Sequence, residues 1–197
     1  MLSRSCWKQD TPTRKSRGRR LVSIVDPYAY RDRLTQPKLI LLGTNDPFWP
    51  VDALNLYWDG LPAPRHVLYV PNNGHGLRDM GRVMAGVVAL HRRAAAGPPL
   101  PDLSWRFDQT KTGLKLTVES TPAPLRVNAW VAEAPQRDFR RAVWSPQPFE
   151  VVDGRHVFEC PRPGQGWKAF FGEIIYPDDP GAFFLSTTVR VLGAAAQ

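Results

Sequence analysis

The sequence predicts a mixed α/β segment followed by an all-β sandwich. Residues 21–96 alternate short apolar runs with helical patterns, which is typical of an α/β arrangement. A Gly/Pro-rich stretch at 97–101 then predicts a linker. Residues 102–197 form short alternating runs separated by turn signals, which indicates a β-sandwich. A chain of 197 residues has room for one ordinary domain or two small ones.

Residues 1–20 differ from the rest of the chain. They are polar and basic, they contain Asp10 as their single acid, and they show no apolar periodicity, so we expect a disordered tail. The net charge of +8 raises the question of nucleic acid. Trp7 is the tail's only aromatic residue, so a stacking platform is missing and no nucleic-acid partner is expected. The chain shows neither an apolar stretch long enough for a transmembrane helix nor the apolar core of a signal peptide.

Four elements are predicted in the α/β segment. The apolar run 38–43, bounded by Pro37, is typical of a parallel strand buried on both faces. Asp52 is placed to cap a short helix that ends near Asp59. A second strand is expected at 66–70, and residues 77–96 keep a 3.6-residue apolar period, which predicts the clearest helix of the chain.

The β segment shows alternation at several places, as in residues 114–118 and 126–130. Turn signals such as Asp153-Gly154 separate the runs. Strands are predicted at 103–108, 113–120, 124–133, 139–145, 149–160, 166–176 and 183–193.

One strand is predicted to have an unpaired side. The 39–42 strand has one encoded neighbour within the α/β segment, so its other edge would be apolar and exposed. We therefore expect self-association through 39–42, unless the β segment or a partner covers that edge. On the same grounds, residues 21–96 alone are expected to be marginally stable.

Two loops that follow strands carry the candidate catalytic side chains. Asp46 follows the first strand and His75 follows the second. Because the carboxyl ends of parallel strands meet at one edge of a sheet, the two side chains are expected to meet there. A carboxylate that accepts the Nδ1–H of a histidine fixes its tautomer and makes the ring a competent general base. The order acid then histidine, 29 residues apart, is the order of α/β hydrolases after their serine.

The chain resembles the PhoPQ-activated pathogenicity-related proteins. The resemblance rests on residues 24–34, the 43–49 and 71–75 loops, Asp138-Phe139-Arg140 with Trp144, and the 166–173 run. It covers about residues 21–193, and residues 1–20 match nothing in the family. The resemblance implies an α/β-hydrolase fold followed by a β-rich domain, with Asp46 as the acid and His75 as the histidine of the triad. The family is usually exported, so without a visible signal peptide the compartment stays open.

The sequence departs from that family at the nucleophile. No G-x-S-x-G is present, and Ser16 in Arg-Lys-Ser-Arg-Gly lacks both the first glycine and a preceding apolar strand. We therefore expect the C-terminal part of a hydrolase-like protein that is inactive alone, consistent with a truncated gene or a displaced start. Two alternatives stay open: a non-catalytic binding or signalling module that uses the sandwich, and a hydrolase with an unrecognised nucleophile. The candidates for that nucleophile are Ser3, Ser5 and Cys6.

No cofactor and no metal are expected. The four histidines and two cysteines are scattered without the spacing of a zinc site. Cys6 and Cys160 are expected to be unpaired thiols, and the substrate class is not indicated by the sequence.

Overall fold

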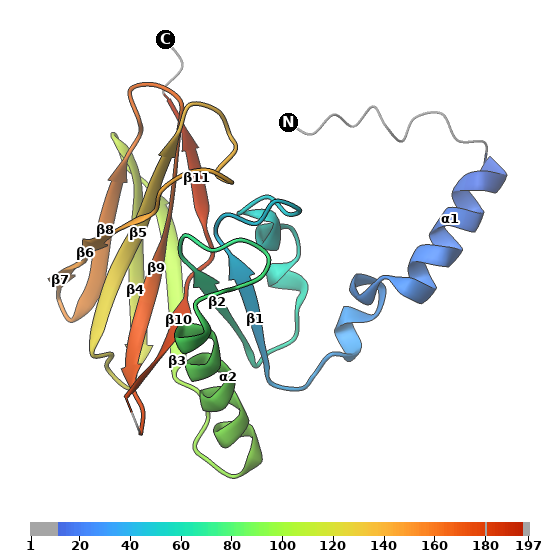
Figure 1. Cartoon of the computed structure of the whole chain (residues 1–197), viewed down its shortest axis with the longest axis horizontal. Helices are drawn as coiled ribbons and strands as arrows, with labels where there is room; N and C mark the ends of the chain where they lie inside the picture. Colours follow the sequence, from blue (N-terminus) through green and yellow to red (C-terminus); the bar gives the residue numbers. More distant parts are fainter. Residues whose placement is uncertain (1–11, 180, 195–197) are drawn as a thin grey trace.

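The computed structural model describes residues 12–179 and 181–194. Helix α1 (Pro12–Val25) extends away from the body of the molecule, as Figure 1 shows. The 3₁₀ helix η2 (Pro27–Arg33) follows it, and Asp26 caps η2 by accepting a hydrogen bond from the Tyr28 amide. Residues 12–20 were expected to belong to a disordered tail, and the structure describes them as helical. Pro12 suits the first turn of a helix, and arginine and lysine are good helix formers. Residues 1–11 lie outside the described residues.

The α/β part contains two parallel strands, β1 (Lys38–Gly43) and β2 (Arg65–Val70). Two 3₁₀ helices, η3 (Ala53–Leu56) and η4 (Trp58–Gly60), lie between them. Helix α2 (Met80–Ala95) follows β2, and Asp79 caps it by accepting a hydrogen bond from the Arg82 amide. The predicted strands and the predicted long helix are therefore present, with α2 beginning three residues later than expected.

The β part supplies nine strands within the described residues. In chain order these are β3 (Asp102–Gln109), β4 (Gly113–Thr121), β5 (Arg126–Ala134), β6 (Ser145–Pro148), β7 (Glu150–Val152), β8 (Arg155–Pro161), β9 (Trp167–Pro177), β10 (Ala182–Ser186) and β11 (Arg190–Gly193).

Two sheets form, and one of them joins both parts of the chain. The seven-stranded sheet has the order β1-β2-β10-β9-β5-β6, with β11 also paired to β9. The four-stranded sheet has the order β3-β4-β8-β7. The junction between the α/β part and the β part is the antiparallel pairing of β2 with β10 at Val67 and Ser186. The fold is mixed α/β plus β, and its division into separately folding units at 97–101 stays a prediction.

The core lies between the two sheets and under α2. Leu116 of β4 and Phe170 and Ile174 of β9 are fully buried in the main cluster between the sheets. A second cluster contains Tyr69 of β2 and Phe171 of β9, whose ring centroids lie 5.2 Å apart. β9 is buried on both faces, so one face contributes to the cluster between the sheets and the other packs against Tyr69 of the α/β part.

A buried ion pair ties α2 to the sheet. Arg82 of α2 pairs with Glu173 of β9, which is 1% exposed and also accepts a hydrogen bond of 3.0 Å from Trp130 Nε1. A buried carboxylate of this kind requires such partners, because an unpaired charge in the interior is strongly destabilising.

Four local predictions were wrong. Residues 139–144 form turns instead of a strand, and β6 begins only at Ser145. The segment 149–160 is a hairpin that turns at Asp153-Gly154, and 183–193 is interrupted at 187–189. The helix expected over 52–59 is instead the pair η3 and η4, and Asp52 makes no side-chain cap.

The edge of β1 is unpaired in the part of the chain that the structure describes. β1 hydrogen-bonds to β2 alone, and β10 covers the far side of β2. Self-association through 39–42 therefore stays a prediction. Among the described residues, no helix combines the length and apolar character needed to cross a bilayer.

Candidate functional site

Asp46 lies in the tight turn that follows β1. Its side chain is buried, and Oδ1 accepts hydrogen bonds from the backbone amides of Phe48 at 2.8 Å and Trp49 at 3.4 Å. These two bonds fix the carboxylate against its own loop. Its second oxygen, Oδ2, is left for a partner from the loop that follows β2.

That partner is His75. Its Nδ1 lies 2.8 Å from Asp46 Oδ2, and its side chain is 60% exposed. The ring packs edge-on against Phe48, with centroids 5.0 Å apart. The structure thus brings together the two side chains that the sequence singled out, with a buried acid behind an accessible imidazole. Their catalytic role stays a prediction.

The two loops meet because β1 and β2 are parallel and in register. Gly43 pairs with Val70 at the ends of the strands. Beyond this point the Asn45 amide donates to Asn73 O at 2.9 Å, and the Asn72 amide donates to Thr44 Oγ1 at 2.8 Å. The backbones that carry Asp46 and His75 are therefore bonded directly to each other.

Gly43 permits this close approach. A Cβ at this position would lie 2.3 Å from Asn73 O and 2.5 Å from Gly74 O, both of them backbone atoms. No side chain fits in that space, so glycine is required on steric grounds rather than for its backbone angles. In the sequence, Gly43 indicates only the end of a strand.

The electrostatics of the site favour an ionised acid. Burial of Asp46 opposes its ionisation, but the Phe48 amide and the His75 ring outweigh burial, so the pKa of Asp46 lies below its usual value. An ionised Asp46 favours a proton on His75 Nδ1 and leaves Nε2 of the neutral ring as the acceptor. Chemically, the arrangement can take up a proton at Nε2.

Two asparagines that sequence reasoning missed attach these loops to the β part. Asn45 Nδ2 donates to backbone oxygens in the 139–144 turn, the shortest bond being 2.7 Å to Ala142 O. Asn72 donates through Nδ2 to Trp144 O at 2.9 Å and accepts from the Trp144 amide at 2.8 Å. The only local signal was an asparagine after each strand, which usually indicates a simple turn.

A pocket of about 270 Å³ lies beside Asp46. Phe48 and Trp49 line it from the first loop, and Arg137 and Arg140 line it from the β part. Each arginine has a carboxylate partner: Arg137 pairs with Asp52, and Arg140 pairs with Asp138. The pocket therefore holds two ion pairs and one further carboxylate, that of Asp46, and His75 is not among its lining residues.

A family comparison shows which proteins the chain is related to. The model of the PhoPQ-activated pathogenicity-related proteins matches residues 9–140, which is about two thirds of the chain. The chain belongs to this family. The match includes both loops, with Asp46 and His75, and it begins within residues 1–20, where sequence reasoning found no resemblance.

A curated relative of the PhoPQ-related chain is the Autocrine proliferation repressor protein A of Dictyostelium discoideum. The two are 30% identical over 182 residues, which cover 79% of this chain and 36% of the relative. The chain thus spans about a third of the length of that relative. No solved structure matches the chain.

Among the described residues, the side-chain hydrogen bond of His75 runs through Nδ1 to Asp46, and none through Nε2 to a hydroxyl is seen. Ser16 falls within α1, at a position whose side chain is not described, and Ser3, Ser5 and Cys6 lie outside the described residues. Cys160 is described, and burial raises the pKa of its thiol to about 12, so it is not a thiolate at neutral pH. Within the described ranges no three His, Cys, Asp or Glu side chains are arranged to hold a metal ion.

Proposed function

We propose that Asp46 and His75 are the acid–histidine pair of an α/β-hydrolase-type site, in which His75 is the general base and Asp46 orients it. The observation that carries this proposal is the 2.8 Å contact between Nδ1 and a buried carboxylate at the ends of two parallel strands. The parallel strands and the covering helix α2 fit a portion of an α/β-hydrolase domain.

The chain as given is not expected to hydrolyse esters by covalent catalysis. A triad histidine activates a serine held in a strained strand–turn–helix elbow, and the sequence has no G-x-S-x-G. Without a nucleophile and its oxyanion donors, the pair can accept a proton but cannot form an acyl-enzyme. The nucleophile of a complete site would have to be supplied by another segment.

A kinetic experiment tests whether the chain as given lacks covalent hydrolysis. The purified chain, the variants His75→Ala and Asp46→Asn, and the control His91→Ala, which removes an exposed histidine on α2, are incubated with p-nitrophenyl acetate. We expect no burst and no saturable turnover from any of them. A saturable turnover that is lost in His75→Ala and kept in His91→Ala would show instead that the chain is an active hydrolase with its own nucleophile.

A second candidate function is a non-catalytic binding or signalling module. It is favoured by the relative, whose name describes a repressor of proliferation. In this case the sandwich would supply the binding surface and the loops would serve only to join the two parts. The two functions are distinguished by a pull-down with the immobilised chain: a partner held equally by wild type and by Asp46→Asn would support the binding module.

A further inference from the structure

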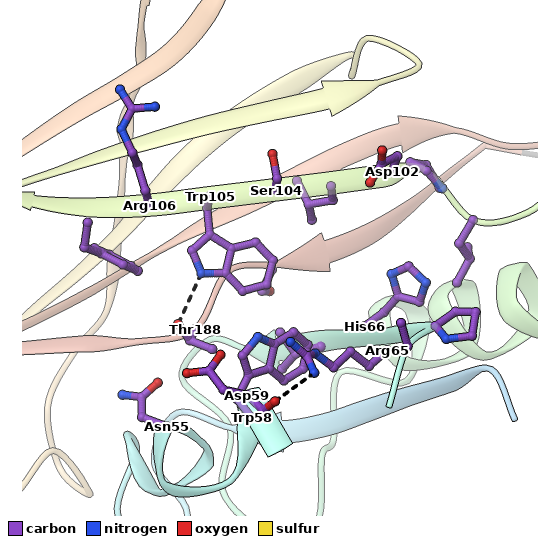
Figure 2. Close-up of a pocket in the computed structure, with 18 of the residues that line it drawn as sticks. Asn55, Trp58, Asp59, Arg65, His66, Asp102, Ser104, Trp105, Arg106 and Thr188 are labelled. Atoms are coloured by element: carbon purple, nitrogen blue, oxygen red, sulfur yellow. Dashed lines mark hydrogen bonds between the residues drawn. The ribbon is translucent and has the colours of Figure 1, made fainter. Parts of the chain in front are cut away.

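A cavity of about 1300 Å³ opens between β3 and the α/β part of the chain. It lies where the four-stranded sheet ends at β3, while the larger sheet continues through β2 and β1. Figure 2 shows its walls: β3 on one side, and Trp58, Arg65 and His66 on the other. Neither Asp46 nor His75 lines it, so the cavity is separate from the proposed catalytic site.

One wall of the cavity is a strand edge. β3 pairs with β4 and with no other strand in the described part of the chain, so its second edge has unpaired backbone groups. Residues 101–107 line the cavity without interruption, so both faces of the strand and its backbone border the space. An unpaired strand edge of this length is a template for another strand.

The cavity is also positively charged. Its lining includes five arginines, Arg65, Arg93, Arg106, Arg162 and Arg190, against two acids, Asp59 and Asp102. Arg93 pairs with Asp178, and Arg106 pairs with Asp108 and Glu119. Within the described residues, the other three arginines form no ion pair with a carboxylate. They are Arg65, Arg162 and Arg190.

These three guanidinium groups are held by neutral partners. Arg65 donates to Leu61 O and lies over the Trp58 ring, with 5.0 Å from its Cζ to the centroid. Arg190 lies over the Phe107 ring at 4.5 Å, and its nearest oxygen acceptors are both 3.5 Å away. Burial lowers the pKa of Arg190, because desolvation disfavours its charge. Asp59 and Asp52 act on Arg190 through space but form no direct ion pair with it. The cavity thus presents oriented cations that lack a carboxylate in direct contact and outnumber the acids of the lining.

We propose that this cavity binds an extended acidic peptide, which adds a strand to the free edge of β3 and sets its carboxylates against Arg65, Arg162 and Arg190. Backbone pairing with an exposed edge supplies affinity in such complexes, and side chains at alternate positions supply specificity. An arginine matches a carboxylate with two parallel hydrogen bonds. The volume exceeds the range of about 300–1000 Å³ that is usual for small-molecule sites, which favours a chain-like ligand.

The test uses a fluorescein-labelled peptide of alternating valine and glutamate, with binding to the whole chain followed by fluorescence polarisation. A matched peptide replaces every glutamate with glutamine, and a third peptide carries N-methyl groups on alternate amides. We expect the acidic peptide to bind, the glutamine peptide to bind at least about tenfold more weakly, and the N-methylated peptide not to bind. Amide signals of residues 102–109 are expected to become protected from exchange when the acidic peptide binds.

Arginine variants localise the site. Arg190→Gln and Arg162→Gln are each expected to weaken binding about tenfold, whereas Arg126→Gln, an exposed arginine on β5 outside the cavity, leaves it unchanged. Arg162 is exposed, so its variant keeps the test decisive if Arg190→Gln does not fold. The proposal is overturned by equal binding of the glutamine or N-methylated peptide, by an equal loss in Arg126→Gln, or by binding of an acidic oligosaccharide but not of the peptide.

Discussion

Gly43 is the residue on which the meeting of Asp46 and His75 depends. The backbone of the second loop passes so close to Gly43 that any side chain there would overlap two carbonyl oxygens. We predict that Gly43→Ala lowers the free energy of unfolding by about 1–3 kcal/mol, because backbone atoms must move to relieve the overlap. Urea denaturation measures this loss. The control is Gly76→Ala, next to His75, where an added Cβ meets nothing within 4 Å; an equal loss in both variants would contradict the steric explanation.

His66 of β2 makes stability depend on pH. Burial, and secondarily the charge of Lys38, lowers the pKa of His66 to about 4 in the folded chain, against 6.5 for the ordinary side chain. The unfolded chain therefore binds a proton between these values when the folded chain does not. The stabilisation is fully present above pH 6.5 and is lost as the pH falls toward 4, by about 1–3 kcal/mol.

The variant His66→Gln isolates this effect. Its stability is expected to change less than that of wild type between pH 6.5 and 4, in urea denaturation at a series of pH values. The exposed His91 provides the control, since His91→Gln should retain the wild-type slope. Parallel curves for wild type and His66→Gln would show that His66 is not the group responsible.

At the scale of elements, the 139–144 turn is held in place by hydrogen bonds to side chains that lie far away in the sequence. Asn72 accepts from and donates to the backbone of Trp144, and its φ of +56° favours asparagine or glycine. We predict that Asn72→Gly lowers the free energy of unfolding by about 1–3 kcal/mol, since the Trp144 amide and carbonyl lose their partners while the backbone angle is accommodated. Differential scanning calorimetry gives the measurement. A variant as stable as wild type would show that the amide contacts contribute nothing.

The same contacts explain which elements were predictable. The strands at 38–43 and 66–70 and the long helix follow from local apolar periods, and the structure has them. Residues 139–144 also have an apolar pattern, but their backbone groups bond to Asn45 and Asn72, which lie more than 70 residues earlier. A local pattern cannot indicate such partners. Likewise, Asp52 pairs with the distant Arg137 instead of capping a helix.

At the candidate site, sequence reasoning predicted the acid and the histidine but not what holds them. Asp46 and His75 stand at the ends of two recognisable strands, so their meeting follows from the parallel arrangement. The steric requirement at Gly43 and the two asparagine contacts depend on three-dimensional packing, which leaves no periodic pattern in the sequence.

At the scale of the whole molecule, one sheet runs through both parts of the chain. β10 pairs with β2, α2 packs on β10, and Arg82 of α2 pairs with Glu173 of β9. We predict that residues 21–96 alone do not fold as a monomer, because removing the β part exposes Val67 and Tyr69 and leaves β2 with β1 as its only neighbour. Amide NMR spectra decide the matter. Sharp, dispersed signals from a monomeric 21–96 segment would contradict the prediction.

The proposed role of Asp46 and His75 is tested most directly by ¹⁵N NMR of the His75 side chain. If the buried carboxylate orients the ring, the neutral imidazole carries its proton on Nδ1, and Asp46→Asn shifts the population toward the Nε2–H tautomer. We expect this shift for His75 and no shift for His91. A His75 ring with its proton on Nε2 in the wild-type chain, unaltered in Asp46→Asn, would contradict the pairing on which the proposed function rests.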